Sequence, residues 1–188
     1  GIPEEFFKQN SRKEKNKILF LGRVSPVKDL STLIKALPMV SDRRMILEIV
    51  GPSEEDYKKK LQLLVNELGL NDQVIFSKPI YDLRKKIRKI DSARVFILPS
   101  KTEAMPQSLI ESMARGKVVI ASDNRGSRSI IRDGKNGYLF KVGDHEGLAE
   151  KINTALSKNQ KMIRVNAKRS VKQFSWRKLS KVLNNIIS

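Results

Sequence analysis

Five short apolar runs recur along the first two thirds of the chain, separated by segments with helical spacing. The runs show little polar alternation, as is typical of strands buried on both faces of a sheet. They are KILFLG (17–22), MILEIVG (45–51), VIF (74–76), VFILPS (95–100) and VVIAS (118–122). Apolar stripes between them predict helices over 30–40, 61–68, 83–90 and 109–114. This alternation predicts an α/β domain with a Rossmann-like, doubly wound parallel sheet, which binds ligands beyond the carboxyl ends of its strands.

Composition and turn signals divide the chain into three expected parts. Residues 1–16 are polar and irregular, which indicates the remnant of an interdomain linker. Residues 17–157 form the α/β domain, which ends with the turn-rich RDGKNGYLF (132–140), a short strand and a helix over 148–156. Residues 158–188 form a basic helical tail that packs on this domain or on a missing N-terminal half.

The tail ends in an amphipathic pattern, WRKLSKVLNNII (176–187). Its apolar residues share one helical face, and they are Trp176, Leu179, Leu183, Ile186 and Ile187. Packing of this basic helix against the parent protein is preferred, and contact with an anionic membrane surface remains the alternative.

The charge of the chain predicts a partner with negative charge. Lys and Arg number 38 against 20 Asp and Glu, and residues 151–188 hold ten Lys or Arg without any Asp or Glu. Phosphate, an anionic lipid or a nucleic acid would complement this excess. Because aromatic residues make up only 6% of the chain and do not interleave with the basic runs, nucleic acid is not an expected partner.

Several other kinds of site and location are not expected. The chain has no cysteine, and its one histidine, His145, has no second ligand nearby, so no metal site is predicted. We interpret His145 as a surface residue just before a helix. No apolar run approaches the ~18 residues that cross a bilayer, and the first residues lack a signal-peptide core. We therefore expect a soluble, cytoplasmic protein. Peripheral contact with the cytoplasmic face of the membrane is a further hypothesis.

Two loops that follow predicted strands are candidates for a ligand site. In GRVSPVKD (22–29), Gly22 permits a tight turn, and Arg23 and Lys28 are suited to phosphate, although an ordinary solvated loop fits equally well. The loop lacks the glycine fingerprints of dinucleotide and P-loop sites. In GPS (51–53), Gly51 would let backbone approach a ligand, while Ser53 is expected to cap the next helix.

The third candidate is TEAMPQSLIE (102–111). Pro106 suits the first position of a helix, where the free N–H groups of the next three residues, Gln107, Ser108 and Leu109, would hold an anion. Glu103 would precede this helix, and Glu111 would lie about one turn inside it. Carboxylates accept hydrogen bonds from sugar hydroxyls, whereas the cations and the helix end suit a diphosphate. The pattern is that of a nucleotide sugar, although this stretch alone would favour ordinary helix-start residues.

The motifs GRVSPVK, IVG, PSKTEAMPQSLIESMARGKVVIAS and IRDGKNGYLF, in this order, resemble the donor-binding C-terminal half of the retaining glycosyltransferases with the GT-B fold (group 1, family 4). The match runs from about residue 17 to about residue 156, and the seven-residue spacing between Glu103 and Glu111 is fairly specific. GIPEEFF (1–7) resembles the family's passage between its two halves. The resemblance implies one half of a two-domain enzyme.

The resemblance also implies roles for individual residues. Arg23 and Lys28 would grip the donor diphosphate, Glu103 would hold hydroxyls of the transferred sugar, and Glu111 would hold the ribose hydroxyls. Lys78, Pro79 and Ile80 would lie beside the base, and the backbone across Met105, Pro106, Gln107, Ser108 and Leu109 would complete the phosphate site. Gly22 and Gly51 are the other expected donor contacts. Of all these residues, Glu103, Arg23 and Lys28 are the expected catalytic residues. The donor would be a UDP- or GDP-sugar, with UDP preferred because no guanine-specific carboxylate lies near Pro79. No metal or other cofactor would be obligatory, and the missing half would bind a glycan or lipid-linked acceptor.

Three residues depart from the family's pattern. Ala104 stands where the family commonly has glycine after the first glutamate. The alanine restricts the backbone conformations available beside the sugar. Asp29 follows Lys28 where glycine is usual, which would weaken the local positive field. Ser129 stands where glutamate is frequent, so no role is transferred to it.

Two other readings remain. A related two-domain architecture serves nucleotide-sugar epimerases, but this half shows no acid or base group for C2 of a sugar. The second alternative is a non-enzymatic basic module that binds nucleic acid or an anionic membrane. Salt-sensitive binding to a nucleic-acid duplex, without preference for nucleotides, would favour this hypothesis.

Overall fold

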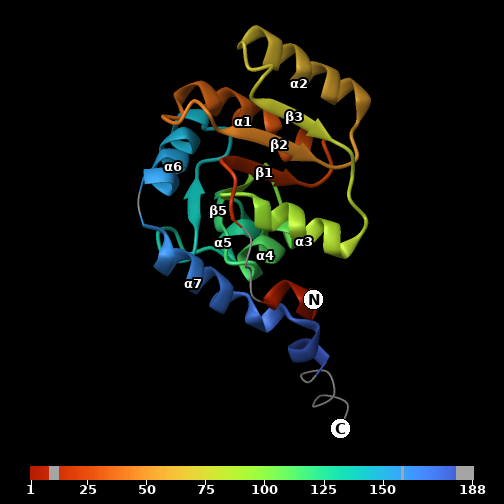
Figure 1. Ribbon diagram of the computed structural model, residues 1–188, viewed down its shortest axis with the longest axis vertical. Helices are drawn as coiled ribbons and strands as arrows, with labels where there is room; N and C mark the ends of the chain where they lie inside the picture. Colours follow the sequence, from red (N-terminus) through yellow and green to blue (C-terminus); the bar gives the residue numbers. More distant parts are fainter. Residues whose placement is uncertain (9–12, 158, 181–188) are drawn as a thin grey trace.

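The computed structural model describes residues 1–8, 13–157 and 159–180, and a six-stranded parallel sheet forms its centre (Figure 1). The strands lie in the order β3-β2-β1-β4-β5-β6. They are β1 (Lys17–Leu21), β2 (Ile46–Val50), β3 (Val74–Ser77), β4 (Val95–Leu98), β5 (Val118–Ser122) and β6 (Tyr138–Phe140). The order reverses between β1 and β4, where doubly wound sheets form their ligand crevice. The predicted Rossmann-like α/β fold is confirmed.

Helices cover both faces of this sheet (Figure 1). They are α1 (Leu30–Ala36), α2 (Glu55–Glu67), α3 (Leu83–Ser92), α4 (Gln107–Ala114), α5 (Arg125–Arg128), α6 (His145–Ser157) and α7 (Lys161–Ser170). On one side α1 contacts α2 and α6, and on the other α4 contacts α7 and the N-terminal turn η1 (Glu4–Phe7). The central strands β1, β4 and β5 are almost wholly buried, so the core lies on both sides of the sheet.

Several local expectations need correction. The first helix ends at Ala36 rather than Val40, and a 3-10 turn over Leu37–Met39 follows, because Pro38 cannot donate a helical hydrogen bond. Ser53 does not cap α2: it bridges to Val24, and the residue before the helix is Glu54. His145 is itself the first residue of α6 and is partly buried.

The two ends of the described chain lie side by side (Figure 1). Ile2 forms a β-bridge with Ser175, and Phe6 is fully buried. Arg115 forms a two-point ion pair with Asp91 and donates hydrogen bonds to carbonyl groups of residues 5, 6 and 8. The expected linker therefore packs on the domain at its beginning, while the division of the chain into three parts stays a prediction.

A buried lysine anchors the second part of the expected linker. Lys117 donates to the Glu14 carboxylate at 2.7 Å and to the carbonyl groups of Asp91 and Ala93. Burial lowers the pKa of Lys117, and Glu14 opposes this shift. Residue 14 is thus held against the end of α3.

The basic tail is only partly described. Residues 176–180 are helical, with Trp176 about half exposed. Leu183, Ile186 and Ile187 of the predicted apolar face lie outside the described residues.

Candidate active site

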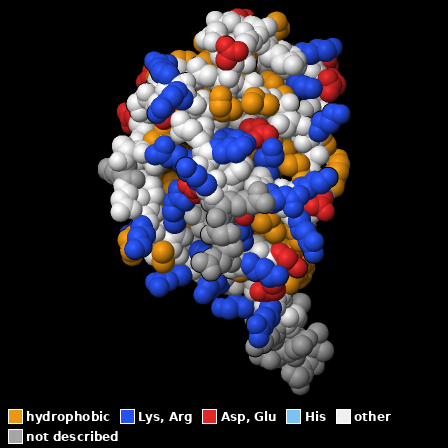
Figure 2. Space-filling view, in the orientation of Figure 1, with side chains coloured by type: hydrophobic (Ala, Val, Ile, Leu, Met, Phe, Trp, Pro, Cys, Tyr) orange, Lys and Arg blue, Asp and Glu red, His pale blue; other side chains and the backbone are white. Residues whose placement is uncertain are grey.

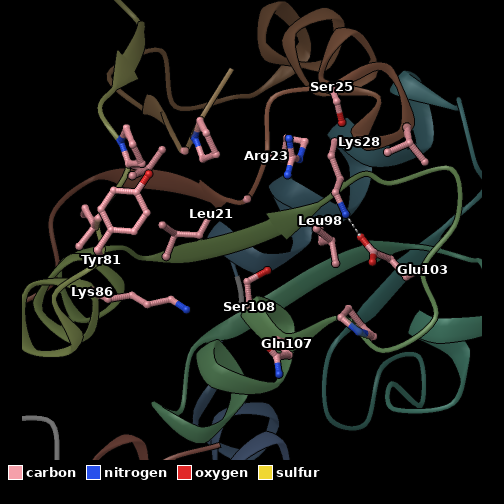
Figure 3. Close-up of a pocket in the computed structure, with 18 of the residues that line it drawn as sticks. Leu21, Arg23, Ser25, Lys28, Tyr81, Lys86, Leu98, Glu103, Gln107 and Ser108 are labelled. Carbon is pink, nitrogen blue, oxygen red and sulfur yellow. Dashed lines mark hydrogen bonds and ion pairs between the residues drawn. The ribbon is translucent and has the colours of Figure 1, made fainter. Parts of the chain in front are cut away.

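A cavity of about 620 Å³ opens at the carboxyl ends of β1, β2 and β4 (Figure 3). The loops after β1, β2, β3 and β4 line it together with the beginning of α4. It therefore lies where the reversal of strand order between β1 and β4 predicts a ligand crevice.

The loop after β1 lies close against the loop after β2. Gly22 donates to the Val50 carbonyl at 3.0 Å, and Val24 donates to the Pro52 carbonyl at 2.8 Å. A Cβ at Gly51 would lie 1.9 Å from the Gly22 carbonyl oxygen, so a side chain at Gly51 would force the loops apart. Gly51 lines the cavity, as expected. Its missing side chain, however, makes room for the backbone of Gly22 rather than for a ligand.

Lys28 and Glu103 form an ion pair at the cavity wall (Figure 3). Lys28 Nζ lies 2.6 Å from Glu103 Oε1, and both side chains are largely buried. The two residues are 75 positions apart in the chain, and the sequence patterns had assigned them to different parts of a ligand. Each neutralises the charge of the other.

Arg23 completes the cationic side of the cavity. Its side chain is exposed and projects into the cavity (Figure 3), and it has no ion-pair partner among the described residues. Asp29, expected to weaken the local field, instead accepts hydrogen bonds from Ser31 and Thr32 in α1. The φ of Asp29 is 46°, in the left-handed region that favours glycine. Aspartate at this position therefore holds a less favourable backbone conformation than glycine would.

The beginning of α4 forms the opposite side of the cavity. Pro106 precedes the first helical residue rather than occupying it, since its ψ of 85° is not helical. Gln107 and Ser108 line the cavity, and among the described residues their N–H groups have no backbone acceptor. The N–H of Leu109 donates to the Pro106 carbonyl at 3.1 Å, and Leu109 is fully buried away from the cavity. Two N–H groups, not three, are therefore available to an anion here.

Glu111 lies behind the cavity wall rather than in it. It is 6% exposed and does not line the cavity, whereas its ion-pair partner Lys86 of α3 does. Glu111 Oε1 accepts a hydrogen bond of 2.7 Å from Lys86 Nζ, while Oε2 lies within 2.5 Å of the same atom without a hydrogen bond of its own. Burial raises the pKa of Glu111, and the Lys86 ammonium acts in the opposite direction.

The expected base-binding loop contributes Pro79 and Ile80 to the cavity, whereas Lys78 does not line it. Met105 lines it from the loop before α4. The sequence patterns missed three residues that contribute polar atoms: Ser25, Tyr81 and Lys86. Tyr81 directly follows the expected loop, so extending that loop by one residue would have found it. No local signal distinguishes Lys86 from the other cations of α3.

Lys and Arg side chains are spread over the visible face of the molecule (Figure 2). No described helix combines the length and apolar character needed to cross a membrane. Within residues 1–8, 13–157 and 159–180, no three His, Asp or Glu side chains gather in a way that could hold a metal ion.

Similarity to known proteins covers most of the chain. The family described as "Glycosyl transferases group 1" matches residues 1–172. The putative glycosyltransferase EpsD of Bacillus subtilis is 34% identical over 66% of this chain and 32% of its own length. The phosphatidyl-myo-inositol mannosyltransferase of Mycobacterium leprae is 33% identical over 85% of this chain and 42% of its own. The chain thus spans less than half the length of these curated relatives.

Solved structures agree with this relationship. Anabaena Alr3699/HepE, in complex with UDP and glucose, superposes with a TM-score of 0.85 at 25% identity, covering 93% of this chain and 48% of that one. The C-terminal domain of the group 1 protein LpcC from Francisella tularensis has a TM-score of 0.82 at 22% identity, covering 92% and 97%, and shows the fold alone. The chain therefore belongs to the group 1 glycosyltransferases, and it forms the Rossmann-like C-terminal half of their GT-B fold.

Proposed function

We propose that this chain is the donor-binding half of a retaining glycosyltransferase, which transfers a hexose-type sugar from a UDP- or GDP-sugar to a glycan or lipid-linked acceptor. One observation carries this proposal: the cations of the β1 loop face the free N–H groups of Gln107 and Ser108 across one cavity. That arrangement suits a diphosphate. The acceptor would bind to a part of the protein outside this chain.

The cavity would act by stabilising the leaving group. As the bond between the anomeric carbon and the donor phosphate breaks, its electron pair moves onto the phosphate oxygen. Arg23, Lys28 and the two N–H groups would stabilise this growing charge because they are already in place. These groups would supply the positive charge without an obligatory metal. The acceptor hydroxyl would then bond through its oxygen to the same face of the anomeric carbon, which retains its configuration, and its proton would pass to the leaving phosphate oxygen.

Glu103 would orient the transferred sugar by accepting hydrogen bonds from its hydroxyl groups. In the structure its carboxylate lies 2.6 Å from Lys28 Nζ. Donor binding would therefore exchange partners: the diphosphate takes over Lys28, and the sugar hydroxyls take over Glu103. Lys28 would keep a counter-charge and Glu103 would keep hydrogen-bond donors, which limits the cost of desolvation.

UDP is the preferred nucleotide. The solved structure of Alr3699/HepE, 25% identical to this chain, contains UDP-glucose. The base would lie near Pro79, Ile80 and Tyr81, which line the cavity. We also propose that the protein works in the cytoplasm, and that the cations after Glu150 allow peripheral contact with an anionic membrane that carries the acceptor.

Calorimetric titration of this chain with UDP, GDP and ADP tests the proposal. We expect one nucleoside diphosphate to bind selectively, with affinity lost in Lys28→Ala and Glu111→Ala. Lys101→Ala is the matched control, because Lys101 is exposed and does not line the cavity. Binding that Lys28→Ala leaves unchanged would contradict the proposal, as would salt-sensitive binding to duplex DNA without nucleotide preference. The chain alone should transfer no sugar.

A further inference from the structure

The hydroxyl group of Ser25 is buried beside the cavity. Ser25 is 3% exposed, it lines the cavity, and its Oγ has no hydrogen-bond donor or acceptor among the residues that the structure describes. An unpaired buried hydroxyl destabilises a folded domain, so most such groups in proteins are satisfied. A partner from outside the described chain would satisfy this hydroxyl.

Local structure does not use this hydroxyl either. Ser25 directly precedes the 3-10 turn Pro26–Lys28, where a serine side chain commonly caps the turn. Here the side chain makes no capping bond, and only the Ser25 carbonyl accepts the Lys28 N–H, at 2.9 Å. In Figure 3 the hydroxyl points toward the Lys28 side chain. It is thus turned away from its own backbone and toward Lys28, the residue that would hold the diphosphate.

The neighbours of this hydroxyl indicate the group that it would meet. Arg23 and Lys28 belong to the same loop and present cationic donors to the same cavity. A phosphate oxygen accepts several hydrogen bonds at once, so it can bind a guanidinium, an ammonium and a hydroxyl together. A sugar hydroxyl would leave Arg23, which has no ion-pair partner among the described residues, without a counter-charge.

We infer that Ser25 binds the donor diphosphate directly, as a third side chain beside Arg23 and Lys28. This inference rests on the proposed function, because it assigns one more residue to the same site. It also gives the unpaired hydroxyl a use: the group would destabilise the domain alone and stabilise its complex with the diphosphate.

The test compares Ser25→Ala with Ser100→Ala. The Ser100 hydroxyl is also buried and unpaired, but Ser100 does not line the cavity. Affinities for UDP, GDP, uridine, guanosine and inorganic pyrophosphate are measured by calorimetry, and melting temperatures are measured without ligand. The nucleosides report on base and ribose contacts, and pyrophosphate reports on the phosphate contacts alone.

For Ser25→Ala we expect the affinity for the bound nucleoside diphosphate and for pyrophosphate to fall about tenfold, the scale of one hydrogen bond to a charged group. Nucleoside affinity should not change. The melting temperature should stay level or rise by about 2 °C, because an unsatisfied group is removed. Ser100→Ala should show the same thermal response with unchanged affinities.

Two results would overturn the inference: a Ser25→Ala variant that binds diphosphate as the wild type does, or one that loses stability together with affinity. Failure of the proposed function is distinguishable. If the wild type binds pyrophosphate through Ser25 but no nucleotide, the phosphate contact stands and the donor assignment falls. If the wild type binds neither nucleotide nor pyrophosphate, both fall.

Discussion

Lys86 Nζ lies 2.5 Å from Oε2 and 2.7 Å from Oε1 of Glu111, and of this pair only the lysine lines the cavity. Burial raises the pKa of Glu111, and Lys86 opposes that shift. A protonated carboxyl accepts fewer hydrogen bonds than a carboxylate. In the proposed function, the ability of Glu111 to accept hydrogen bonds from ribose hydroxyls therefore depends on Lys86.

Replacing Lys86 with methionine should make nucleotide binding more sensitive to acid. In the proposed site Glu111 must be ionised to bind the ribose, so affinity should fall as the pH drops through its pKa. Without the ammonium this pKa rises further, and the fall should begin at a higher pH. The measurement is UDP affinity between roughly pH 5 and pH 8, with Lys85→Met, an exposed neighbour on α3 that does not line the cavity, as the control. A Lys86→Met variant with the wild-type pH profile would refute this role.

The ion pair between Lys28 and Glu103 predicts opposite effects of its two members on UDP binding. Lys28→Met should weaken binding about tenfold or more, because a charged contact to phosphate is lost. Glu103→Gln should leave UDP affinity unchanged or raise it, because Lys28 no longer has a competing partner. In the complete enzyme, however, Glu103→Gln should lower sugar transfer on the order of 100-fold.

Calorimetry with UDP, which has no sugar to contact Glu103, separates these effects. Lys101→Met controls for a general loss of positive charge near the loop. Equal losses of UDP affinity in Lys28→Met and Glu103→Gln would show that the pair acts as a structural unit instead.

Most of the fold was predictable because its signals are local. The five apolar runs correspond to β1 to β5, since strands buried on both faces read as uninterrupted apolar segments. Helix α7 lies in the predicted helical tail, but its bounds were not predicted, because Ala167 is its only buried residue while Met162 remains 64% exposed. A helix that buries so little has no apolar stripe to recognise. Helix α5 spans only Arg125–Arg128, too short for any periodicity.

The site was predictable where its residues directly follow strands. Arg23, Lys28 and Glu103 were found in this way, because parallel strands bring their carboxyl ends to one edge. Contacts across the fold were not predictable: the pairs of Lys28 with Glu103 and of Lys86 with Glu111 depend on how loops and helices meet. The third N–H group, from Leu109, was wrongly assigned because the helix begins at Gln107 and its first turn uses that donor.

Gly126 should be essential for the position of Glu103. A Cβ on Gly126 would lie 2.4 Å from the Glu103 carbonyl oxygen and 2.8 Å from its Cβ. Both contacts are with atoms that cannot move without shifting the loop, so Gly126→Ala should displace Glu103 from Lys28. We expect sugar transfer by the complete enzyme to fall at least about tenfold while a folded domain remains, because small displacements of positioning groups are costly.

Circular dichroism of the Gly126→Ala variant checks the fold, and turnover of a donor sugar checks the site. Arg125→Ala introduces the same residue at the adjacent exposed position and should have little effect. Unchanged transfer by Gly126→Ala would show that the loop around Glu103 tolerates the displacement.

Glu48 on β2 should make the domain sensitive to acid. The residue is 5% exposed, and its carboxylate accepts hydrogen bonds from Lys17 at 2.5 Å, Lys89 at 2.6 Å and Ser77 at 2.7 Å. Burial favours the neutral acid, but these bonds outweigh it and lower the pKa of Glu48 to about 2 from 4.5. The folded domain therefore binds the Glu48 proton more weakly than the unfolded chain does.

A depressed pKa in the folded state stabilises the protein at any pH above the unfolded value of 4.5, and this stabilisation is lost as the pH falls toward 2. The contribution is at most roughly 3 kcal/mol. Glu48→Gln should lower the free energy of unfolding near neutral pH and flatten its decline between about pH 5 and pH 2. Denaturant titrations at a series of pH values measure this slope. Glu54→Gln, at an exposed position before α2, is the control and should keep the wild-type slope. A Glu48→Gln variant with the wild-type slope would show that Glu48 does not govern the acid response.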